Sequence, residues 1–239
     1  MGFSAFFIDV AMGILTVLFN KQIMKCLGAD ALAVYGPVIN VSTFVQCCAY
    51  SVGQAAQPII STNFGALRMD KIRETLRYAL YTVAFFGIFW TALSLVCPNL
   101  YIKIFMKPTE RILKIAPQII RRYSVSFLLL PLNIFATYCF RAILKAKTAF
   151  KISIMRGPVI SGALIMILPA LFEADFLWFA MPVTELAIMF YAVYMLTYSV
   201  LSVQEIASVC GFDDALYFSR AFKRHTGISP GDFIALNRV

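Results

Sequence analysis

The chain has 239 residues, of which 61% are hydrophobic and only 14% are charged. Soluble domains carry about 45–50% apolar and about 25% charged residues, so this composition excludes an ordinary soluble protein and indicates an integral membrane protein. The formal net charge of +9 is attributed to loops rather than to a nucleic-acid surface, because Lys and Arg flank membrane spans and set their orientation.

The first apolar run covers residues 3–19 and contains a single charged side chain, Asp9. Its length is close to the minimum of about 17 residues for a membrane-crossing helix. A carboxylate at that depth costs roughly 2.5–3.5 kcal/mol on insertion scales, and such groups normally face a bundle interior or a water-filled cavity. Asp9 is therefore either a coupling or substrate-facing acid, or a structural acid hydrogen-bonded within the bundle.

Five further apolar runs follow, each long enough to cross a bilayer. They cover approximately residues 33–62, 79–97, 123–142, 152–172 and 176–198. Polar connections are expected at 20–30 and 100–122. The basic, amphipathic segment 65–77 has the spacing and mixed charge of a helix lying at the membrane surface. The sequence thus predicts an all-α, polytopic membrane protein with a six-helix transmembrane bundle.

Six spans place both ends of the bundle on the same side of the membrane. Assigning them to the cytoplasm puts the basic stretches 68–77 and 141–156 inside and the acidic turn 173–175 outside, as the positive-inside rule favours. The basic 100–122 connection, which would lie outside, is the exception. We therefore expect a bacterial cytoplasmic (inner) membrane protein with both termini in the cytoplasm. Since the first run starts almost at Met1 and no Lys or Arg precedes Lys21, we also expect the chain to begin within a longer protein.

Residues that carry catalytic or metal chemistry are sparse. The six cysteines form no CxxC pair, and most of them lie inside apolar runs, where they are typical of small packing residues rather than of a disulfide framework. His225 is the single histidine, and the sequence shows no Walker loop, dinucleotide fingerprint or nucleophile–base arrangement. We expect no enzyme activity, no metal site and no cofactor.

Three stretches resemble the C-terminal half of the multidrug and toxic-compound extrusion (MATE) transporters. They are GFSAFFIDVAMGILTVLFN, DALAVYGPVINVSTFVQCCAYSVGQAAQPIISTNFGA and FAMPVTELAI. The similarity covers about residues 1–199 and includes the order of the spans. It implies one of two six-helix lobes of an exporter of organic, often cationic, small molecules, coupled to Na⁺ or H⁺. The implied partners are the lipid bilayer and a missing or separate first lobe.

The resemblance also assigns roles to particular residues. Some family members use a carboxylate in the seventh helix of twelve for cation coupling, and Asp9 occupies the matching place after the GFS opening. Those members pair it with an acid in the tenth helix, which here is 123–142. That span holds Asn133 but no acid, which is a departure from the family pattern. In other members the coupling acid lies in the first lobe.

Three more polar residues inside the spans are candidates for the same site. Glu185 lies near the middle of the sixth run and is either a functional acid or a helix-packing one. Gln54 and Gln57 are three positions apart in the second run, and they either line the cleft or hydrogen-bond between helices. The candidate cation or substrate site comprises Asp9, Gln54, Gln57, Asn133 and Glu185.

The composition changes after residue 200. The stretch IASVCGFDDALYFSRAFKRHTGISP resembles the second helix-turn-helix of AraC-type transcription regulators. Residues 203–209 are predicted to form a short helix with Gly211 after its end, and Asp213 is predicted to be the N-cap of a second helix at 214–226. Phe218 and Phe222 would face the first helix.

The outward face of that second helix holds the DNA-binding candidates Ser219, Arg220, Lys223 and Arg224, as a groove-entering helix requires. The resemblance covers only one of the family's two helix-turn-helix motifs, so we expect a partial domain at 200–239, after a transporter lobe at 1–199. We do not expect DNA to be a partner. Two alternatives remain open. One is a membrane-tethered AraC-type regulator, and the other is a half-transporter that acts as a dimer or with a separate lobe.

Overall fold

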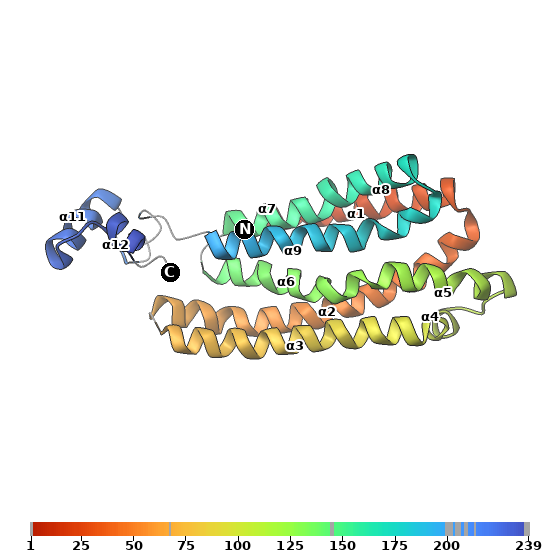
Figure 1. Ribbon diagram of the computed structural model, residues 1–239, viewed down its shortest axis with the longest axis horizontal. Helices are drawn as coiled ribbons and strands as arrows, with labels where there is room; N and C mark the ends of the chain where they lie inside the picture. The colour runs from red at the N-terminus through yellow and green to blue at the C-terminus, as the bar shows by residue number, and fades with distance from the viewer. Residues whose placement is uncertain are drawn as a thin grey trace. The chain divides into compact units, whose positions relative to one another are not determined.

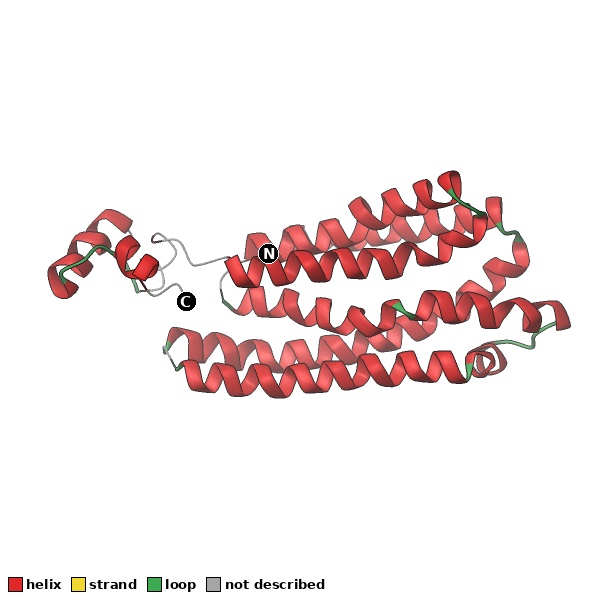
Figure 2. Ribbon diagram, in the orientation of Figure 1, coloured by secondary structure: helices red, strands yellow, loops and turns green. Residues whose placement is uncertain are grey.

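The computed structural model describes residues 2–66, 68–143, 146–198, 203, 207, 210–212 and 214–236. Side chains are described at the same positions except 2–9, 11–12, 146, 196–198 and 234–236. Within this part of the chain, every regular element is a helix (Figure 2). Contacts between residues divide the chain into two units, Met1–Val193 and Tyr194–Val239.

The first unit is a succession of helices with short connections (Figure 1). In chain order they are α1 (Gly2–Cys26), α2 (Ala29–Gly65), α3 (Met69–Val96), α4 (Pro98–Phe105), α5 (Glu110–Ser124), α6 (Ser126–Ala142), α7 (Ala146–Ile154), η1 (Met155–Val159), α8 (Ile160–Leu171), η2 (Ala174–Phe179) and α9 (Ala180–Tyr198). A single residue, Val125, separates α5 from α6. The π-helical turn η1 joins α7 to α8, and the 3₁₀-helix η2 leads into α9.

Among the described residues, five helical stretches are long and apolar enough to cross a membrane. They are Ala29–Gly65, Met69–Val96, Glu110–Ala142, Lys147–Leu171 and Ala174–Met195. The remaining expected span, at 3–19, lies within α1, which is 25 residues long. At about 1.5 Å per residue, every one of these helices exceeds the roughly 30 Å of a bilayer's hydrocarbon core. The structure confirms the expected all-α membrane bundle.

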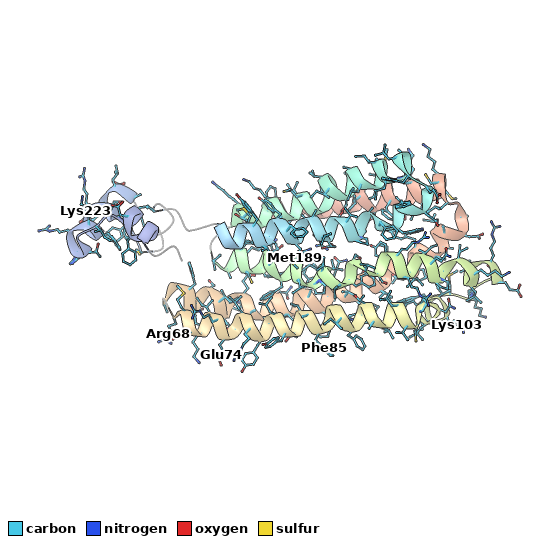
Figure 3. All side chains as sticks on the ribbon, viewed as in Figure 1. Arg68, Glu74, Phe85, Lys103, Met189 and Lys223 are labelled. Carbon is cyan, nitrogen blue, oxygen red and sulfur yellow. The ribbon has the colours of Figure 1, made fainter. Side chains whose placement is uncertain are left out.

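The helices of the bundle lie in two layers (Figure 1). One layer contains α2, α3 and the α5–α6 pair, which pack against one another, and the other contains α9 and the α7–η1–α8 helix, with α1 packed along η1 and α8. Aromatic rings join the layers at one end. Tyr35 of α2 stacks on Phe19 of α1, with ring centroids 4.7 Å apart, and lies 6.2 Å from the ring of Trp178 in η2. On the outer side of α3, Phe85 points away from the bundle, as a lipid-facing side chain does (Figure 3).

Two glycines allow α6 to lie close to its neighbours. A Cβ built on Gly87 of α3 would lie 2.8 Å from the carbonyl oxygen of Leu128, and one built on Gly53 of α2 would lie 2.5 Å from the ring of Tyr138. Small residues at helix contacts are the usual means of close packing in membranes, where lipid tails compete with side chains for apolar surface. Gly87 thus permits a close backbone approach of α3 to α6, and Gly53 leaves room on α2 for the ring of Tyr138.

Two segments predicted as separate from the spans are parts of longer helices. The segment 65–77 is not an independent surface helix, because residues from Met69 onward form the first turns of α3. The 100–122 connection contains most of α4 and most of α5, which begins where the Thr109 hydroxyl accepts the backbone N–H of Ile112 at 3.4 Å. Hydropathy alone missed α5 because its charged and apolar residues alternate around the helix. Its apolar side, including Ala116 and Ile119, is buried in the core.

The described part of the second unit contains α11 (Ala215–Thr226) and α12 (Pro230–Leu236). The N-cap of α11 is Asp214, whose carboxylate accepts the backbone N–H of Leu216 at 2.8 Å, and not Asp213 as predicted. Gly227 ends α11 in the left-handed region at φ 80°, as glycine C-caps do. The helix expected at 203–209 lies mostly outside the described residues.

Aromatic side chains form the core of this unit. Phe218 is buried, and its ring lies 5.4 Å from that of Phe212 and 5.7 Å from that of Phe222. Phe222 in turn lies 5.6 Å from Phe233 of α12. Phe218 and Phe222 therefore face inward, as their spacing of one helical turn predicts.

Candidate functional site

A π-helical turn holds Arg156 inside the fifth span. Pro158 has no backbone N–H to donate, and the N–H of Ile160 reaches the carbonyl of Met155, five residues back. This register leaves the carbonyl of Arg156 without its usual partner four residues on. The hydroxyl of Ser161 donates to that carbonyl at 2.6 Å. Hydroxyl groups commonly satisfy backbone groups that a proline frees in membrane helices.

Glu185 on α9 is the acid that pairs with Arg156. Nε of Arg156 donates to Oε1 of Glu185 at 2.8 Å, and the two side chains are 18% and 1% exposed. Beside the pair, the hydroxyl oxygens of Ser161 and Thr184 lie 3.2 Å apart, which joins α8 to α9. A carboxylate and a guanidinium inside an apolar bundle are each costly alone, so their pairing explains why both are tolerated.

Asn133 of α6 completes the surroundings of this acid. Its Nδ2 donates to Oε2 of Glu185 at 2.7 Å and to the backbone carbonyl of the same residue at 2.8 Å. Both partners are acceptors, which fixes the orientation of the amide and uses both of its hydrogens. Asn133 is fully buried, and its Oδ1 has no hydrogen-bond partner in the described part of the chain. Each carboxylate oxygen of Glu185 thus faces one N–H donor.

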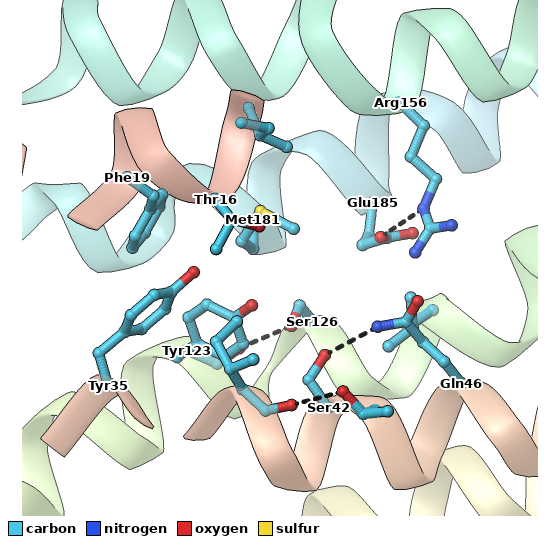
Figure 4. A pocket seen from close by; sticks show the side chains of 14 residues that line it. Thr16, Phe19, Tyr35, Ser42, Gln46, Tyr123, Ser126, Arg156, Met181 and Glu185 are labelled. Atoms are coloured by element: carbon cyan, nitrogen blue, oxygen red, sulfur yellow. Dashed lines mark hydrogen bonds and ion pairs between the residues drawn. The ribbon is translucent and has the colours of Figure 1, made fainter. Parts of the chain in front are cut away.

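A cavity of about 170 Å³ lies between the two layers, with Glu185 and Arg156 in its wall (Figure 4). Across the cavity from this pair, α2 contributes Ser42 and Gln46, and Nε2 of Gln46 donates to Oγ of Ser42 at 3.4 Å. The other lining residues carry rings, aliphatic chains or hydroxyls, and they are Leu15, Thr16, Phe19, Tyr35, Ile39, Thr43, Tyr123, Ser126, Leu130 and Met181. The space is smaller than the roughly 300–1,000 Å³ of drug-sized pockets.

The structure brings two of the five predicted site residues together, Asn133 and Glu185. Gln54 is exposed and Gln57 half-buried, and neither lines the cavity; Gln46, earlier on α2, does. Asp9 belongs to α1, but its side chain lies outside the described ones. The functional roles of all five residues remain predictions.

Arg156 is a site residue to which the sequence analysis gave no role. It fell at the overlap of the basic stretch 141–156 and the expected span 152–172 and was counted with the cytoplasmic charges; the structure places it in η1, within the span Lys147–Leu171. Its sequence context carried a signal, because it stands directly before a Gly-Pro pair at the start of an apolar run. The isolated acid Glu185 in the next span also indicates a basic partner, since charged groups inside spans normally pair.

The DNA-binding candidates lie on α11. Arg220, Lys223 and Arg224 are exposed and Ser219 is half-buried, on the helix whose other side carries buried Phe218. Figure 3 shows Lys223 pointing outward from the helix. The arrangement is that of an amphipathic helix with a basic outer face, and its role in DNA binding stays a prediction.

In the parts of the chain that the structure describes, no three His, Cys, Asp or Glu side chains lie close enough together to hold a metal ion. What the bundle offers is an Arg–carboxylate pair, a buried amide and several hydroxyls around a small cavity. Such a set can bind a small polar ligand or exchange a proton at the carboxylate.

Comparison with protein families matches residues 3–167 to the MatE model and residues 182–235 to a helix-turn-helix domain model. The second match begins inside α9, so the last span and the start of the helix-turn-helix match share residues. More than half of the chain is therefore covered by MatE.

Solved transporters share the fold at low sequence identity. An outward-facing multidrug resistance MATE family transporter of the MOP superfamily is 12% identical with a TM-score of 0.73, over 90% of this chain and 46% of that one. A second solved structure is that of a MOP superfamily transporter from Pyrococcus furiosus Vc1 (DSM3638), for which a reverse polarity of the binding pocket is reported. It is 13% identical with a TM-score of 0.70, and the alignment covers 81% of this chain and 44% of that one. The chain thus spans less than half the length of these transporters.

Curated relatives match only a short part of the chain. The HTH-type transcriptional activator RhaR of Cronobacter sakazakii (strain ATCC BAA-894) is 51% identical over 39 residues, 16% of this chain and 14% of the activator. RhaR of Escherichia coli (strain K12) is 43% identical over 47 residues, 20% of this chain and 17% of the activator. With a MatE match across most of the bundle, a transporter fold and an activator-like stretch, the chain belongs to the MatE family and carries an AraC-type helix-turn-helix after its membrane bundle.

Proposed function

We propose that the chain is one lobe of a cation-coupled exporter of organic, often cationic, small molecules in the bacterial cytoplasmic membrane. The observation that carries the proposal is Glu185, a fully buried acid in the wall of a cavity inside a MatE bundle, held by Arg156 and Asn133. Residues 1–199 would form the lobe and residues 200–239 the partial helix-turn-helix, with both termini in the cytoplasm.

Of the two coupling ions implied by the family, a proton fits Glu185 better than sodium. Both carboxylate oxygens already face N–H donors, and the Arg156 guanidinium lies within hydrogen-bond distance. A metal cation prefers several oxygen ligands and is repelled by a neighbouring positive charge. A proton needs one lone pair on a single oxygen. Sodium coupling would have to use another acid, and Asp9 is the candidate.

Transport is proposed to require a second lobe. The chain spans 46% of an aligned MATE family transporter, and the cavity inside this lobe is too small for a drug-sized molecule. Secondary transporters built from repeats bind substrate between the repeats and alternate access by moving one against the other. The drug would then occupy a cleft between this lobe and a second one, supplied by a separate chain or by a second copy.

The test is dye accumulation in an efflux-deficient host that expresses this chain alone or with a complementing first lobe. We expect the lone chain to match the empty vector and the pair to lower accumulation. Extrusion by the lone chain above the vector level would overturn the requirement for a separate lobe and favour a homodimer.

Variants of the acids test coupling within the active pair. Glu185→Gln keeps the size of the side chain and removes its proton site, and we expect it to abolish extrusion while leaving the chain in the membrane. Asp9→Asn applies the same test to the first span. Glu173→Gln, at an exposed acid between α8 and η2, is the matched control. Unchanged extrusion by Glu185→Gln would contradict a coupling role for this acid.

A second candidate function is a membrane-tethered transcription regulator. The observation in its favour is the helix-turn-helix match, with exposed Arg220, Lys223 and Arg224 on α11. DNA binding by the intact chain is the experiment that separates this function from transport.

A further inference from the structure

The guanidinium of Arg156 has an unused edge inside the cavity. Only its Nε bonds to Glu185, and among the described residues nothing accepts a hydrogen bond from Nη1 or Nη2. Figure 4 shows the guanidinium in the space between the layers, with one of these nitrogens directed toward α2 and the other to the side. Two parallel N–H donors on one guanidinium edge match the two oxygens of a carboxylate. The pair with Glu185 holds the guanidinium in place for such a ligand.

The rest of the cavity sets the size and polarity of the ligand. Its volume is about 170 Å³, and its walls include the rings of Phe19, Tyr35 and Tyr123 and the aliphatic chain of Leu130. An apolar protein cavity of about 150 Å³ is large enough to bind benzene. A ligand with one carboxylate and a body of about the size of one ring would fill this space. Drug-sized molecules and extended metabolites would not fit.

We propose that this cavity binds a small monocarboxylate, with its carboxylate on the Nη1–Nη2 edge of Arg156, together with one proton. The proton follows from charge balance. Glu185 and Arg156 neutralise each other in the empty site, so a bound anion would leave one uncompensated negative charge within the membrane, which is costly. Protonation of Glu185 restores neutrality and frees Arg156 to pair with the ligand.

The groups around Glu185 allow it to take that proton. Among the described side chains that line the cavity, Arg156 of η1 is the one other charged group, and the titratable ones are the phenols of Tyr35 (α2) and Tyr123 (α5). The neighbours from other elements are uncharged, namely Asn133 and Ser126 of α6 and Thr16 of α1. Glu185 is thus the acceptor among the described side chains of this cavity.

This inference concerns binding inside one lobe and goes beyond the proposed export of organic cations. It can be tested on the purified full chain in detergent, without transport or a second lobe. A chain that does not export drugs can still bind the carboxylate, and a chain that does not bind the carboxylate can still export drugs. The two proposals can therefore fail independently.

The binding test compares three ring compounds of nearly the same shape. Benzoate carries the anion, benzamide is neutral, and benzamidinium is a cation. We expect saturable binding of benzoate at one site, with a Kd of about 1 mM or tighter for so small a ligand, and no saturable binding of the other two. Equal or tighter binding of benzamidinium, or no saturable binding of benzoate, would overturn the proposal.

Variants locate the ligand at Arg156. Arg156→Gln should weaken benzoate binding about 10- to 100-fold, as loss of a charged hydrogen-bonding partner does, and Arg156→Lys should fall between it and the wild type. Arg111→Gln is the matched control, because Nε of Arg111 also pairs with a carboxylate, Asp30, at 2.9 Å, but at an exposed position. Benzoate binding that survives Arg156→Gln would overturn the proposal.

Two further measurements keep the test decisive if that variant fails to fold. Ser42→Met keeps the ion pair and fills the cavity, and it should abolish saturable binding. In the wild type, the Kd of benzoate should rise with pH, by up to about tenfold per pH unit, because one proton binds with the ligand. Binding that persists in Ser42→Met, or a Kd that does not change with pH, would contradict the proposed site.

Discussion

Glu185 and Arg156 stabilise each other inside the bundle, but each would be destabilising alone. Their single N–H···O bond of 2.8 Å lies where Glu185 is 1% and Arg156 18% exposed. In such places the desolvation of two charges offsets much of their attraction, and removal of one partner leaves the other uncompensated. The amide of Asn133 adds a second donor to the same carboxylate. The pair is therefore better explained as a site than as a source of stability.

A double-mutant cycle tests this interpretation. We expect Glu185→Gln and Arg156→Gln each to lower the melting temperature of the detergent-solubilised chain, and the double variant to be more stable than either single variant. This order requires a coupling free energy larger than the destabilisation by either single variant, and we expect about 3 kcal/mol, the upper end of the range for residues in direct contact. The measurement is thermal unfolding followed by intrinsic fluorescence or thiol reactivity.

The exposed pair of Asp30 and Arg111, with the same Nε–carboxylate contact at 2.9 Å, provides the control cycle. Its coupling should be at most about 1 kcal/mol, because solvent screens exposed pairs. Equal coupling in the two cycles would show that the interior pair is no stronger than a surface one.

Among the elements, α6 depends on close contact with α3. Gly87→Ala would place a Cβ 2.8 Å from the Leu128 carbonyl oxygen and 3.3 Å from that of Phe127, and backbone atoms of a packed helix cannot move away cheaply. We expect destabilisation by about 1–3 kcal/mol, as for other overpacked sites. Melting of the purified chain measures it.

Gly13→Ala is the matched control within a helix, since a Cβ at Gly13 would meet nothing within 4 Å. It should be neutral or stabilising by up to about 1 kcal/mol, because alanine favours helix more than glycine does. A Gly87→Ala chain as stable as Gly13→Ala would contradict the close approach of α3 and α6.

The sequence predicted elements better than it predicted the site. Apolar length identified the spans, because burial in lipid requires a nearly continuous apolar helix. It failed for α5, whose charged side faces away from the core while Ile112 and Ile119 are buried. At the site, Glu185 and Asn133 were recognisable as polar residues in spans. Arg156 was not, because it stood near the start of its expected span and was counted with the flanking basic residues, and the sequence does not show that its side chain reaches Glu185 on α9.

The element α11 has the shape of a recognition helix but lacks the charge for strong DNA binding. Residues 200–239 carry no net charge, since their basic residues, Arg220, Lys223, Arg224 and Arg238, are matched by Glu205, Asp213, Asp214 and Asp232. Affinity for DNA rests largely on neutralised phosphates and released counterions. Near the N-terminus of α11, Leu216 and Tyr217 are exposed, and Leu216 cannot make bidentate hydrogen bonds to bases.

We therefore expect the intact chain in nanodiscs to bind DNA no tighter than about micromolar at physiological salt, and without sequence preference. Fluorescence anisotropy at low and physiological salt, over a panel of duplexes, measures this. A complete AraC-type domain serves as the positive control. Sequence-dependent binding with a Kd below about 1 μM would instead support the membrane-tethered regulator.

For the whole molecule, the two-layer bundle explains why one lobe can hold a polar site without exposing it. Phe19 and Tyr35 line the cavity, the ring of Trp178 packs against Tyr35, and Arg122 of α5 pairs with Asp175 of η2 at 2.5 Å. The polar groups of the cavity therefore lie between layers rather than toward lipid. This arrangement gives a transporter lobe a protected acid while the outer faces of α3 and α8 remain apolar.

The proposed topology makes a further prediction that the chain's own cysteines can test. With both termini in the cytoplasm, α3 runs outward and ends beside Cys97 on the outer side, whereas Cys210 follows the last span on the inner side. Both are exposed, and Cys139 in the core is 8% exposed. In single-cysteine versions, a membrane-impermeant maleimide should label Cys97 in intact spheroplasts and Cys210 only after permeabilisation, while Cys139 resists in both. Labelling of Cys210 but not Cys97 in intact spheroplasts would invert the orientation, and the basic α5 would then lie on the cytoplasmic side, which the positive-inside rule also tolerates.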